Sequence, residues 1–392
     1  MANIKALTGN DAVAYAMKQI NPDVVAAYPI TPQTSIVEKF SEYVSNGEVD
    51  TEMILVESEH SAMSACVGSS AAGARTMTAT SSQGLALMWE IMYIAAGLRL
   101  PIVMPIVNRA LSAPLNIHCD HSDVMGARDS GWVHIFCENA QEAYDTTIQA
   151  IRIAEHPDVQ LPVSVNLDGF IISHEVANVD VYEDDKVKKF VGEFKARSPL
   201  LDLKNPVTVG PLDLQDYYFE HRRQEAEGMK NSLAVIKAVG EEFKKVFGKS
   251  YGFLEGYKLE DAEVVMVGLG STMGTLREII DAARADGKKA GFLKIRVFRP
   301  LPKDEIIAAL KDRKVIAVLD RADSLNAFGG PLFSDIRSLL YGCSNALITN
   351  YIYGLGGREV TEKDLNKVID DSLETAGTKK AKQELTYLGV RE

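Results

Sequence analysis

The sequence predicts an α/β fold, with a parallel sheet covered by helices on both faces and a second, smaller α/β unit after it. Short apolar runs alternate with amphipathic or small-residue segments through residues 8–167. Strands that alternate with helices in this way form parallel sheets. The alternation stops near residue 175 and resumes near residue 262. We therefore expect two domains, residues 1–250 and residues 251–392, with a long helix at the end of the first.

In the first unit, each expected strand is an apolar run and each expected helix fills an interval. Strands are expected at Val24–Ala27, Met53–Val56, Thr76–Thr80, Ile102–Val107, Val133–Phe136 and Pro162–Leu167. Helices are expected over 8–20, after Thr31, over 61–73, after the break at Ser81–Gly84 through Ala96, and over 140–155. The third of these helices consists of small residues, which predicts close packing against its neighbours.

The pattern changes after residue 175. Charged and turn-forming residues dominate 175–215, and a charged helix is expected over Asp213–Phe247, whose charges indicate a solvated face or a subunit contact. In the second unit, strands are expected at Val264–Gly268, Ala290–Val297, Val315–Leu319 and Ala346–Thr349.

The composition of the chain excludes several functional classes of protein. The chain has 392 residues, 46% hydrophobic and 24% charged, as in an ordinary globular protein. Its net charge of −12 argues against a nucleic-acid partner. The most apolar region, 85–107, is interrupted by charges and prolines, so we expect no membrane span. The N-terminus lacks a signal-peptide pattern and the four cysteines form no C-x-x-C pair, so a cytoplasmic protein without its own iron–sulfur or zinc ligands is expected.

Thr31 stands where a strand gives way to a helix. It is followed by Pro32, and threonine and proline are favoured at the N-cap and the first helical turn. The free N–H groups of a helix start, together with a hydroxyl, suit a carboxylate or phosphate. The simpler interpretation is that Thr31 only caps the helix.

Several polar residues follow expected strands in the same way. Thr31, Glu59, Ser81–Gly84 and Arg109 all come directly after an apolar run. Ligands of parallel sheets bind beyond the carboxyl ends of the strands. Glu59 is either a first-turn helix residue or a half-buried carboxylate that hydrogen-bonds a protonated cofactor nitrogen. Arg109 can pair with a neighbouring carboxylate or bind a substrate carboxylate.

Two other patterns predict no site. His118, Asp120, His121 and Asp123 lie on one loop without a second ligand cluster, so no metal site is expected. The segment Gly268–Gly274 resembles a dinucleotide fingerprint, but its spacing is one residue too long, and a structural turn is expected instead.

At the level of whole motifs, the chain resembles the α subunit of multi-subunit pyruvate:ferredoxin oxidoreductases, within the thiamine-diphosphate-dependent 2-oxoacid oxidoreductases. The matching motifs are Y-P-I-T-P-Q-T (28–34), V-E-S-E-H-S-A (56–62), T-A-T-S-S-Q-G-L (78–85), N-R-A-L-S-A-P (108–114), C-D-H-S-D-V-M (119–125), R-D-S-G-W (128–132), V-N-L-D-G-F (165–170), V-F-R-P-L-P (297–302) and Y-G-L-G-G-R (353–358). The resemblance implies a pyrimidine-binding thiamine diphosphate domain followed by a domain like the C-terminal domain of transketolase.

The resemblance also implies roles for single residues. Thr31 and Arg109 would bind the substrate carboxylate or keto group, and Glu59 would contact N1′ of the aminopyrimidine. Ser82 and Gln83 would be further cofactor contacts. The implied reaction is oxidative decarboxylation of pyruvate with coenzyme A to acetyl-CoA and CO2, with electrons passed to ferredoxin, or the reverse.

A second chain is implied as well. The diphosphate-and-magnesium motif of thiamine enzymes, G-D-G followed by Asn, is absent from the sequence, and so are ferredoxin-type cysteine runs. The family therefore implies β, γ and δ subunits that carry Mg²⁺, the diphosphate site and [4Fe-4S] clusters. Alternatives are a related enzyme for branched-chain 2-oxoacids or 2-oxoglutarate, a non-catalytic scaffold subunit, or a stand-alone dehydrogenase based on Gly268–Gly274.

Overall fold

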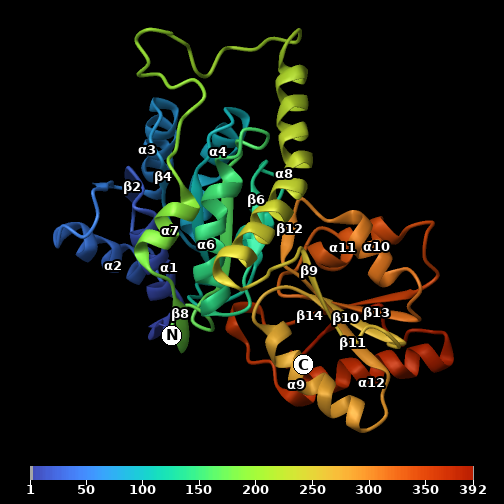
Figure 1. Cartoon of the computed structure of the whole chain (residues 1–392). Helices are drawn as coiled ribbons and strands as arrows, with labels where there is room; N and C mark the ends of the chain where they lie inside the picture. The colour runs from blue at the N-terminus through green and yellow to red at the C-terminus, as the bar shows by residue number, and fades with distance from the viewer. Residues whose placement is uncertain (1–2, 392) are drawn as a thin grey trace.

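The computed structural model describes residues 3–391. They form two α/β units that pack against each other (Figure 1). The strands are β1 (Asn3–Thr8), β2 (Val24–Ala27), β3 (Glu52–Leu55), β4 (Thr76–Met77), β5 (Val103–Asn108), β6 (Val133–Phe136), β7 (Val163–Asp168), β8 (Val176–Val181), β9 (Leu254–Tyr257), β10 (Val264–Gly268), β11 (Ala290–Ile295), β12 (Val297–Arg299), β13 (Val315–Asp320), β14 (Leu347–Ile352) and β15 (Leu385–Tyr387). The α-helices are α1 (Gly9–Ile20), α2 (Thr34–Ser45), α3 (Glu59–Ala72), α4 (Ser82–Gly97), α5 (Ser122–Ala127), α6 (Ala140–Ala154), α7 (Asp184–Val191), α8 (Tyr218–Phe247), α9 (Thr272–Ala285), α10 (Lys303–Leu310), α11 (Pro331–Leu340) and α12 (Glu362–Thr378), and η1 (Leu355–Gly357) is a 3₁₀ turn.

The first sheet has seven strands in the order β12-β6-β7-β5-β4-β2-β3. Every pair from β6 to β3 is parallel. Helices α1, α2 and α6 pack into one hydrophobic core on this sheet, and α3, α4 and α5 pack into a second. Strands β5 and β7 are buried along their whole length, as expected for strands covered on both faces. The prediction of a parallel sheet with helices on both faces is confirmed.

The second sheet has the order β15-β14-β13-β10-β11-β9, and only its edge strand β9 is antiparallel. Its strands form part of the same core as α3 and α4 of the first unit, so the two units are packed together without a solvent layer at that point. A smaller second α/β unit is therefore present, as expected.

One predicted strand is divided between the two sheets. Residues 290–297 were expected to form a single strand, but β11 ends at Ile295, and β12 pairs antiparallel with β6 of the first sheet. Figure 1 shows β12 beside β6, away from β11. Because a strand from the second half of the chain completes the first sheet, the division at residue 250 stays a prediction.

The segment without a clear pattern contains regular structure that the sequence did not predict. Strand β8 pairs antiparallel with β1 in a separate two-stranded sheet, and α7 follows. The charged helix begins at Tyr218 and not at Asp213. Between α7 and α8 the chain forms a long loop that extends beyond the body of the first unit (Figure 1). Leu201, Leu203 and Leu212 on this loop are exposed.

Across residues 3–391, every helix is too short or too polar to cross a lipid bilayer.

Candidate active site at the carboxyl edge of the first sheet

The candidate residues follow four neighbouring strands. Arg109 comes after β5, Ser82 after β4, Thr31 after β2 and Glu59 after β3, and these strands are adjacent in the order β5-β4-β2-β3. All four strands run parallel. Their carboxyl ends therefore meet at one edge of the sheet, where parallel sheets bind ligands. The sequence prediction that these residues lie on neighbouring strand ends agrees with this arrangement.

Thr31 does not cap a helix, so this expectation was wrong. Helix α2 begins at Thr34, and its N-cap is Gln33. The buried Gln33 side chain accepts a hydrogen bond from the N–H of Ile30 (3.1 Å) and donates one to the carbonyl of Ala79 (3.0 Å). These bonds hold the turn at Ile30–Gln33 against the sheet, and α2 begins only after this turn. Thr31 is left exposed in the turn, and Pro32 also precedes the helix.

The guanidinium of Arg109 also binds the turn that contains Thr31. Nη1 donates to the carbonyl of Thr31 (2.8 Å), and Nε donates to the carbonyl of Asn116 (2.9 Å). Arg109 is 6% exposed, and burial lowers the pKa of its guanidinium. An arginine still keeps its charge under these conditions. Within residues 3–391, Nη2 has no hydrogen-bond partner, so one face of this buried cation remains free to bind an anion.

Glu59 is the first residue of α3. The N-cap is Ser58, whose hydroxyl oxygen accepts from the N–H of Ser61, so the helix start does not depend on the Glu59 carboxylate. Glu59 is 7% exposed, and among the described residues nothing donates a hydrogen bond to its carboxylate. A buried carboxylate without a donor is costly unless a ligand supplies one.

Gly84 in α4 makes room for this carboxylate. A Cβ at Gly84 would lie 2.7 Å from Oε1 of Glu59 and 2.5 Å from the hydroxyl oxygen of Thr80. The hydroxyls of Thr80 and Ser81 are buried, and neither has a hydrogen-bond partner among the described residues. An unpaired carboxylate, two unpaired hydroxyls and a glycine therefore follow the ends of β3 and β4, at the carboxyl edge of the sheet.

Ser82 and Gln83 form the turn at the start of α4. Ser82 has a φ of +49°, which is uncommon for a residue with a side chain. Its hydroxyl donates to the carbonyl of Ala110 (2.6 Å), and one end of the Gln83 amide lies against the same hydroxyl (2.7 Å). Ser82 therefore shapes the turn. The other end of the Gln83 amide has no partner among residues 3–391 and can still bind a ligand.

Sequence reasoning missed the main role of Asp123. This residue was considered only for a metal site, and no metal site was expected there. Its buried carboxylate accepts hydrogen bonds from the backbone N–H groups of both Ser82 and Arg109. Burial raises the pKa of Asp123 to about 6, and the N–H donors act in the opposite direction. The donors are mostly backbone groups, and no residue pattern reveals them.

Asp168, at the end of β7, connects the first sheet to the second unit. Its carboxylate lies 2.7 Å from Nε2 of His121, accepts from Nη1 of Arg321 (3.0 Å), and accepts from the backbone and hydroxyl of Ser271 (3.0 and 2.5 Å). Burial alone would raise the pKa of Asp168, but the charges of His121 and Arg321 lower it well below its usual range. Arg321 is in turn held charged, with its pKa raised.

This contact explains the fingerprint-like turn. Gly270 has a φ of +69°, and a Cβ there would lie 2.9 Å from both Asp168 oxygens. The turn before α9 therefore receives a carboxylate from the same chain. Cys119, His121 and Asp168 lie close enough to hold a metal ion. However, Arg321 already neutralises Asp168, and burial raises the pKa of the Cys119 thiol well above its usual value, so the cluster is better satisfied without a cation.

Two of the sequence motifs meet beside this contact. The carbonyl of Cys119 accepts from the N–H of Gly357 (2.7 Å), and the carboxylate of Asp120 accepts from the N–H of Gly356 (3.1 Å). The loop that follows Arg109 is thus fastened to the loop after β14. These two bonds therefore join the two units.

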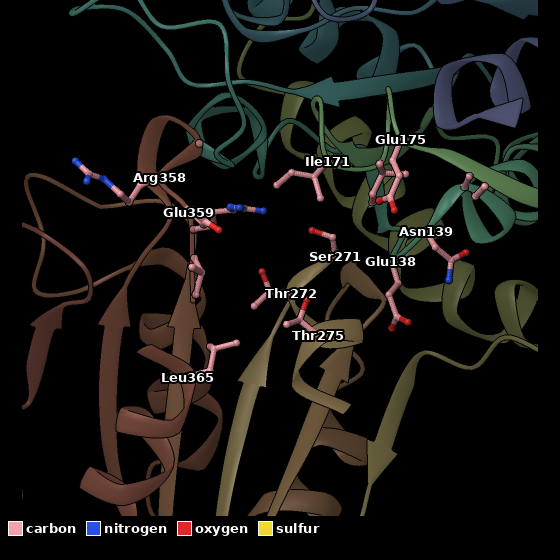
Figure 2. A pocket seen from close by; sticks show the side chains of 16 residues that line it. Glu138, Asn139, Ile171, Glu175, Ser271, Thr272, Thr275, Arg358, Glu359 and Leu365 are labelled. Carbon is pink, nitrogen blue, oxygen red and sulfur yellow. The ribbon is translucent and has the colours of Figure 1, made fainter. Parts of the chain in front are cut away.

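A cavity of about 500 Å³ opens between the two units and is lined in part by Ser271 and Arg321, two of the residues that contact Asp168 (Figure 2). Figure 2 shows Ser271, the N-cap residue of α9, and Thr272 and Thr275 on α9 facing Glu138 and Glu175 of the first unit. Thr31, Glu59 and Arg109 do not line this cavity. They lie at the carboxyl edge of the first sheet, where Thr31 is exposed and Glu59 and Arg109 are buried. Leu55 at the end of β3 and Leu115 in the loop after Arg109 are 72% and 77% exposed.

Two family models match the chain. The model described as pyruvate flavodoxin/ferredoxin oxidoreductase, thiamine diphosphate-binding, covers residues 15–241, and the model described as pyruvate:ferredoxin oxidoreductase core domain II covers residues 262–365. The pyruvate synthase subunit PorA of Thermotoga maritima is 58% identical, over 99% of this chain and 98% of that protein. The chain belongs to the pyruvate:ferredoxin oxidoreductase family. It is an α (PorA-type) subunit, and its first unit is a thiamine-diphosphate-binding domain.

Other members of the pyruvate:ferredoxin oxidoreductase family are also similar over their full length. PorA of Methanocaldococcus jannaschii is 47% identical over 100% of this chain and 99% of that protein. The ketoisovalerate oxidoreductase subunit VorA of Pyrococcus horikoshii is 43% identical over 99% of this chain and 98% of that protein.

Solved structures share the fold. The 2-oxoglutarate:ferredoxin oxidoreductase of Magnetococcus marinus matches 94% of this chain with a TM-score of 0.73 at 20% identity, and this chain spans 66% of that one. A split-gene transketolase matches 94% of this chain and 99% of its own with a TM-score of 0.57 at 11% identity. The expected thiamine-diphosphate-enzyme fold is confirmed.

Proposed function

We propose that the edge of the first sheet formed by Thr31, Glu59 and Arg109 is the half of the pyruvate:ferredoxin oxidoreductase active site that this subunit contributes. The observation that carries the proposal is the pair of unused groups at that edge. Among residues 3–391, Nη2 of Arg109 and the carboxylate of Glu59 have no hydrogen-bond partner, and the two residues follow strands of one parallel sheet. A 2-oxoacid needs a cation for its carboxylate, and a thiamine ring needs an acceptor for its protonated nitrogen.

Arg109 and Thr31 bind and orient the substrate. The bonds to Thr31 and Asn116 fix the guanidinium plane, so that Nη2 presents a donor in a set direction to the carboxylate of pyruvate. Thr31, whose carbonyl accepts from Nη1 of Arg109, is exposed, and its hydroxyl is assigned as a second donor to the same carboxylate. The positive charge also compensates the carboxylate where water is partly excluded.

Glu59 holds a proton at the cofactor. Its carboxylate accepts the N1′–H of the aminopyrimidine, and Gln83 is placed to contact the same ring from the neighbouring turn. When bound, thiamine diphosphate supplies the electron sink that lets the 2-oxoacid lose CO2. Gly84 keeps the space at the Glu59 carboxylate open.

The remaining parts of the enzyme are assigned to other subunits. The chain lacks the G-D-G and Asn motif and iron–sulfur cysteine runs, so we place the diphosphate site, Mg²⁺ and [4Fe-4S] clusters on β, γ and δ subunits. Ferredoxin accepts the electrons of the complex, and coenzyme A accepts the acetyl group. Exposed Leu55 and Leu115 beside the site support coverage by another subunit. The free cysteines, three of them buried, fit a reducing cytoplasmic location.

The decisive experiment replaces the chain in the assembled complex by the Glu59→Gln variant. We expect pyruvate-dependent ferredoxin reduction to fall by on the order of 100-fold or more, because a neutral amide no longer stabilises the protonated ring. Glu57→Gln is the matched control, since Glu57 is exposed two residues earlier in the same segment. Full activity of the Glu59→Gln complex would refute the assignment of Glu59 to the cofactor.

Similarity to VorA keeps a branched-chain 2-oxoacid as the second candidate substrate. The ratio of kcat/KM for pyruvate to kcat/KM for 2-ketoisovalerate in the same complex decides between them. The higher identity to PorA leads us to expect the ratio to favour pyruvate.

A further inference from the structure

Asp123 lies between the cofactor side and the substrate side of the proposed site. It is the second residue of the short helix α5 and is 4% exposed. Oδ2 accepts from the N–H of Ser82 and from the N–H of Arg109, each at 3.0 Å. Oδ1 accepts from the Asn108 amide (3.0 Å) and from the N–H of Val124 (2.7 Å).

These four bonds use the whole acceptor capacity of one carboxylate. An ionised carboxylate offers about four lone-pair positions and no donor. Asp123 therefore has nothing left for a metal ion or a substrate. Its four donors belong to three separate segments, namely the start of α4, the end of β5 and α5 itself. A single side chain thus fixes the relative positions of these segments.

The two backbone N–H groups that donate to Oδ2 show what Asp123 does for the site. Ser82 has a left-handed backbone conformation that a residue with a side chain rarely adopts, and its N–H needs a buried acceptor to remain there. Arg109 carries the guanidinium that contacts Thr31. The same oxygen atom accepts from both residues, so a shift of either one disturbs the other.

We propose that Asp123 is a positioning residue that holds the turn at Ser82–Gln83 and the backbone of Arg109 at a set separation. This separation would place thiamine diphosphate and the 2-oxoacid at the right distance from each other. This inference rests on the proposed function of the sheet edge. Asp123 acts through Ser82 and Arg109 and touches neither ligand. Its expected signature is therefore a joint loss of cofactor and substrate affinity.

The Asp123→Asn variant is the direct test. An amide keeps the shape but replaces one acceptor oxygen by an NH2 donor, which leaves buried N–H groups facing another donor. In the assembled complex we expect the KM for pyruvate and the dissociation constant for thiamine diphosphate each to rise by about 10-fold, with a smaller change in kcat. The dissociation constant is measured by the fluorescence of the cofactor-free complex, independently of turnover.

Asp120→Asn is the matched control for general loosening of this loop. Asp120 is also buried and accepts three bonds, from the N–H and hydroxyl of Ser122 (2.9 and 2.5 Å) and the N–H of Gly356 (3.1 Å), but it contacts neither Ser82 nor Arg109. We expect Asp120→Asn to lower the melting temperature and to leave both affinities within about 2-fold of the wild type. Equal effects of the two variants on affinity would overturn the proposal.

A milder variant covers the case in which Asp123→Asn does not assemble. Asn108→Ala removes one donor to Oδ1 and keeps both backbone donors to Oδ2. We expect both affinities to weaken by roughly 2- to 5-fold, in the same direction as for Asp123→Asn. The proposal would be refuted if the Asp123→Asn complex kept the wild-type KM for pyruvate and the wild-type dissociation constant for thiamine diphosphate. If only the Asn108→Ala complex assembles, the same result in that complex would refute it. An inactive wild-type complex that still binds the cofactor would refute the proposed function alone.

Discussion

The guanidinium of Arg109 donates a hydrogen bond of 2.8 Å to the carbonyl oxygen of Thr31. These residues are far apart in the chain, and they belong to turns after different strands, β5 and β2. The bond joins the two turns across the intervening strand β4 and leaves Nη2 of Arg109 free. A buried cation is thus oriented at the edge of the sheet by main-chain oxygens and not by a carboxylate.

The geometry around Arg109 predicts a strict requirement for arginine. In Arg109→Lys, one amine cannot reach both the Thr31 and Asn116 carbonyls in the planar arrangement of a guanidinium. We expect the KM for pyruvate to rise by about 10- to 100-fold in the assembled complex, with cofactor binding little changed. Steady-state kinetics measures this, and Arg128→Lys, on the surface nearby, is the control. An unchanged KM would show that Arg109 does not bind the substrate.

Gly84 tests the space around Glu59. In Gly84→Ala, the new methyl group would lie within 2.7 Å of the Glu59 carboxylate and must displace it. We expect thiamine diphosphate to bind at least about 10-fold more weakly, while circular dichroism shows the same helix content. Gly68→Ala on α3 is the matched control, because no heavy atom lies within 4 Å of a Cβ there. Equal cofactor affinity in both variants would argue against a ligand at this position.

Asp168 predicts a pH-dependent contribution to stability. Its pKa in the folded protein is lower than that of an ordinary aspartate, about 3.9. A carboxylate of this kind stabilises the fold fully at pH values above its unfolded pKa, and the contribution is lost as the pH falls toward the folded pKa. Asp168→Asn should therefore lower the free energy of unfolding by about 3 kcal/mol at pH 7 and by clearly less once the pH is well below about 3.9 and approaches the folded pKa of Asp168.

Thermal unfolding of the wild type and Asp168→Asn at pH 7 and at about pH 2.5, values set well above and well below an ordinary aspartate pKa of about 3.9, measures the difference. Asp129→Asn is the control, because the Asp129 side chain is exposed. A destabilisation of the same size at both pH values would mean that shape, and not charge, makes the contact with Arg321.

The sheet and its edge were predictable because they depend on local patterns. Apolar runs such as Val24–Ala27 alternate with helices, and parallel strands bring Thr31, Glu59 and Arg109 to one edge without any knowledge of their contacts. The position of the helix start at Thr34 was not predictable. It depends on bonds from Gln33 to Ala79 and from Asn10 to Pro32, between segments that are distant in sequence.

The connections between the units were hidden for the same reason. The partner of Asp168 is Arg321 from the second unit, and β12 leaves its own sheet to pair with β6. Asp123 stood in a motif that invited a metal interpretation, whereas its actual partners are mainly backbone N–H groups. Every residue except proline has a backbone N–H, so only the fold can show which of them a carboxylate binds.

The measurement that tests the central claim most directly is the binding of thiamine diphosphate with Mg²⁺ to the isolated chain and to the complete complex. The sequence lacks the diphosphate motif, and Glu59 and Arg109 both follow strands that end at the carboxyl edge of the first sheet. We expect isothermal titration calorimetry to show cofactor binding to the cofactor-free complex and none to the isolated chain at the same concentrations. Binding of equal affinity to the isolated chain would contradict the claim that a second subunit completes this site.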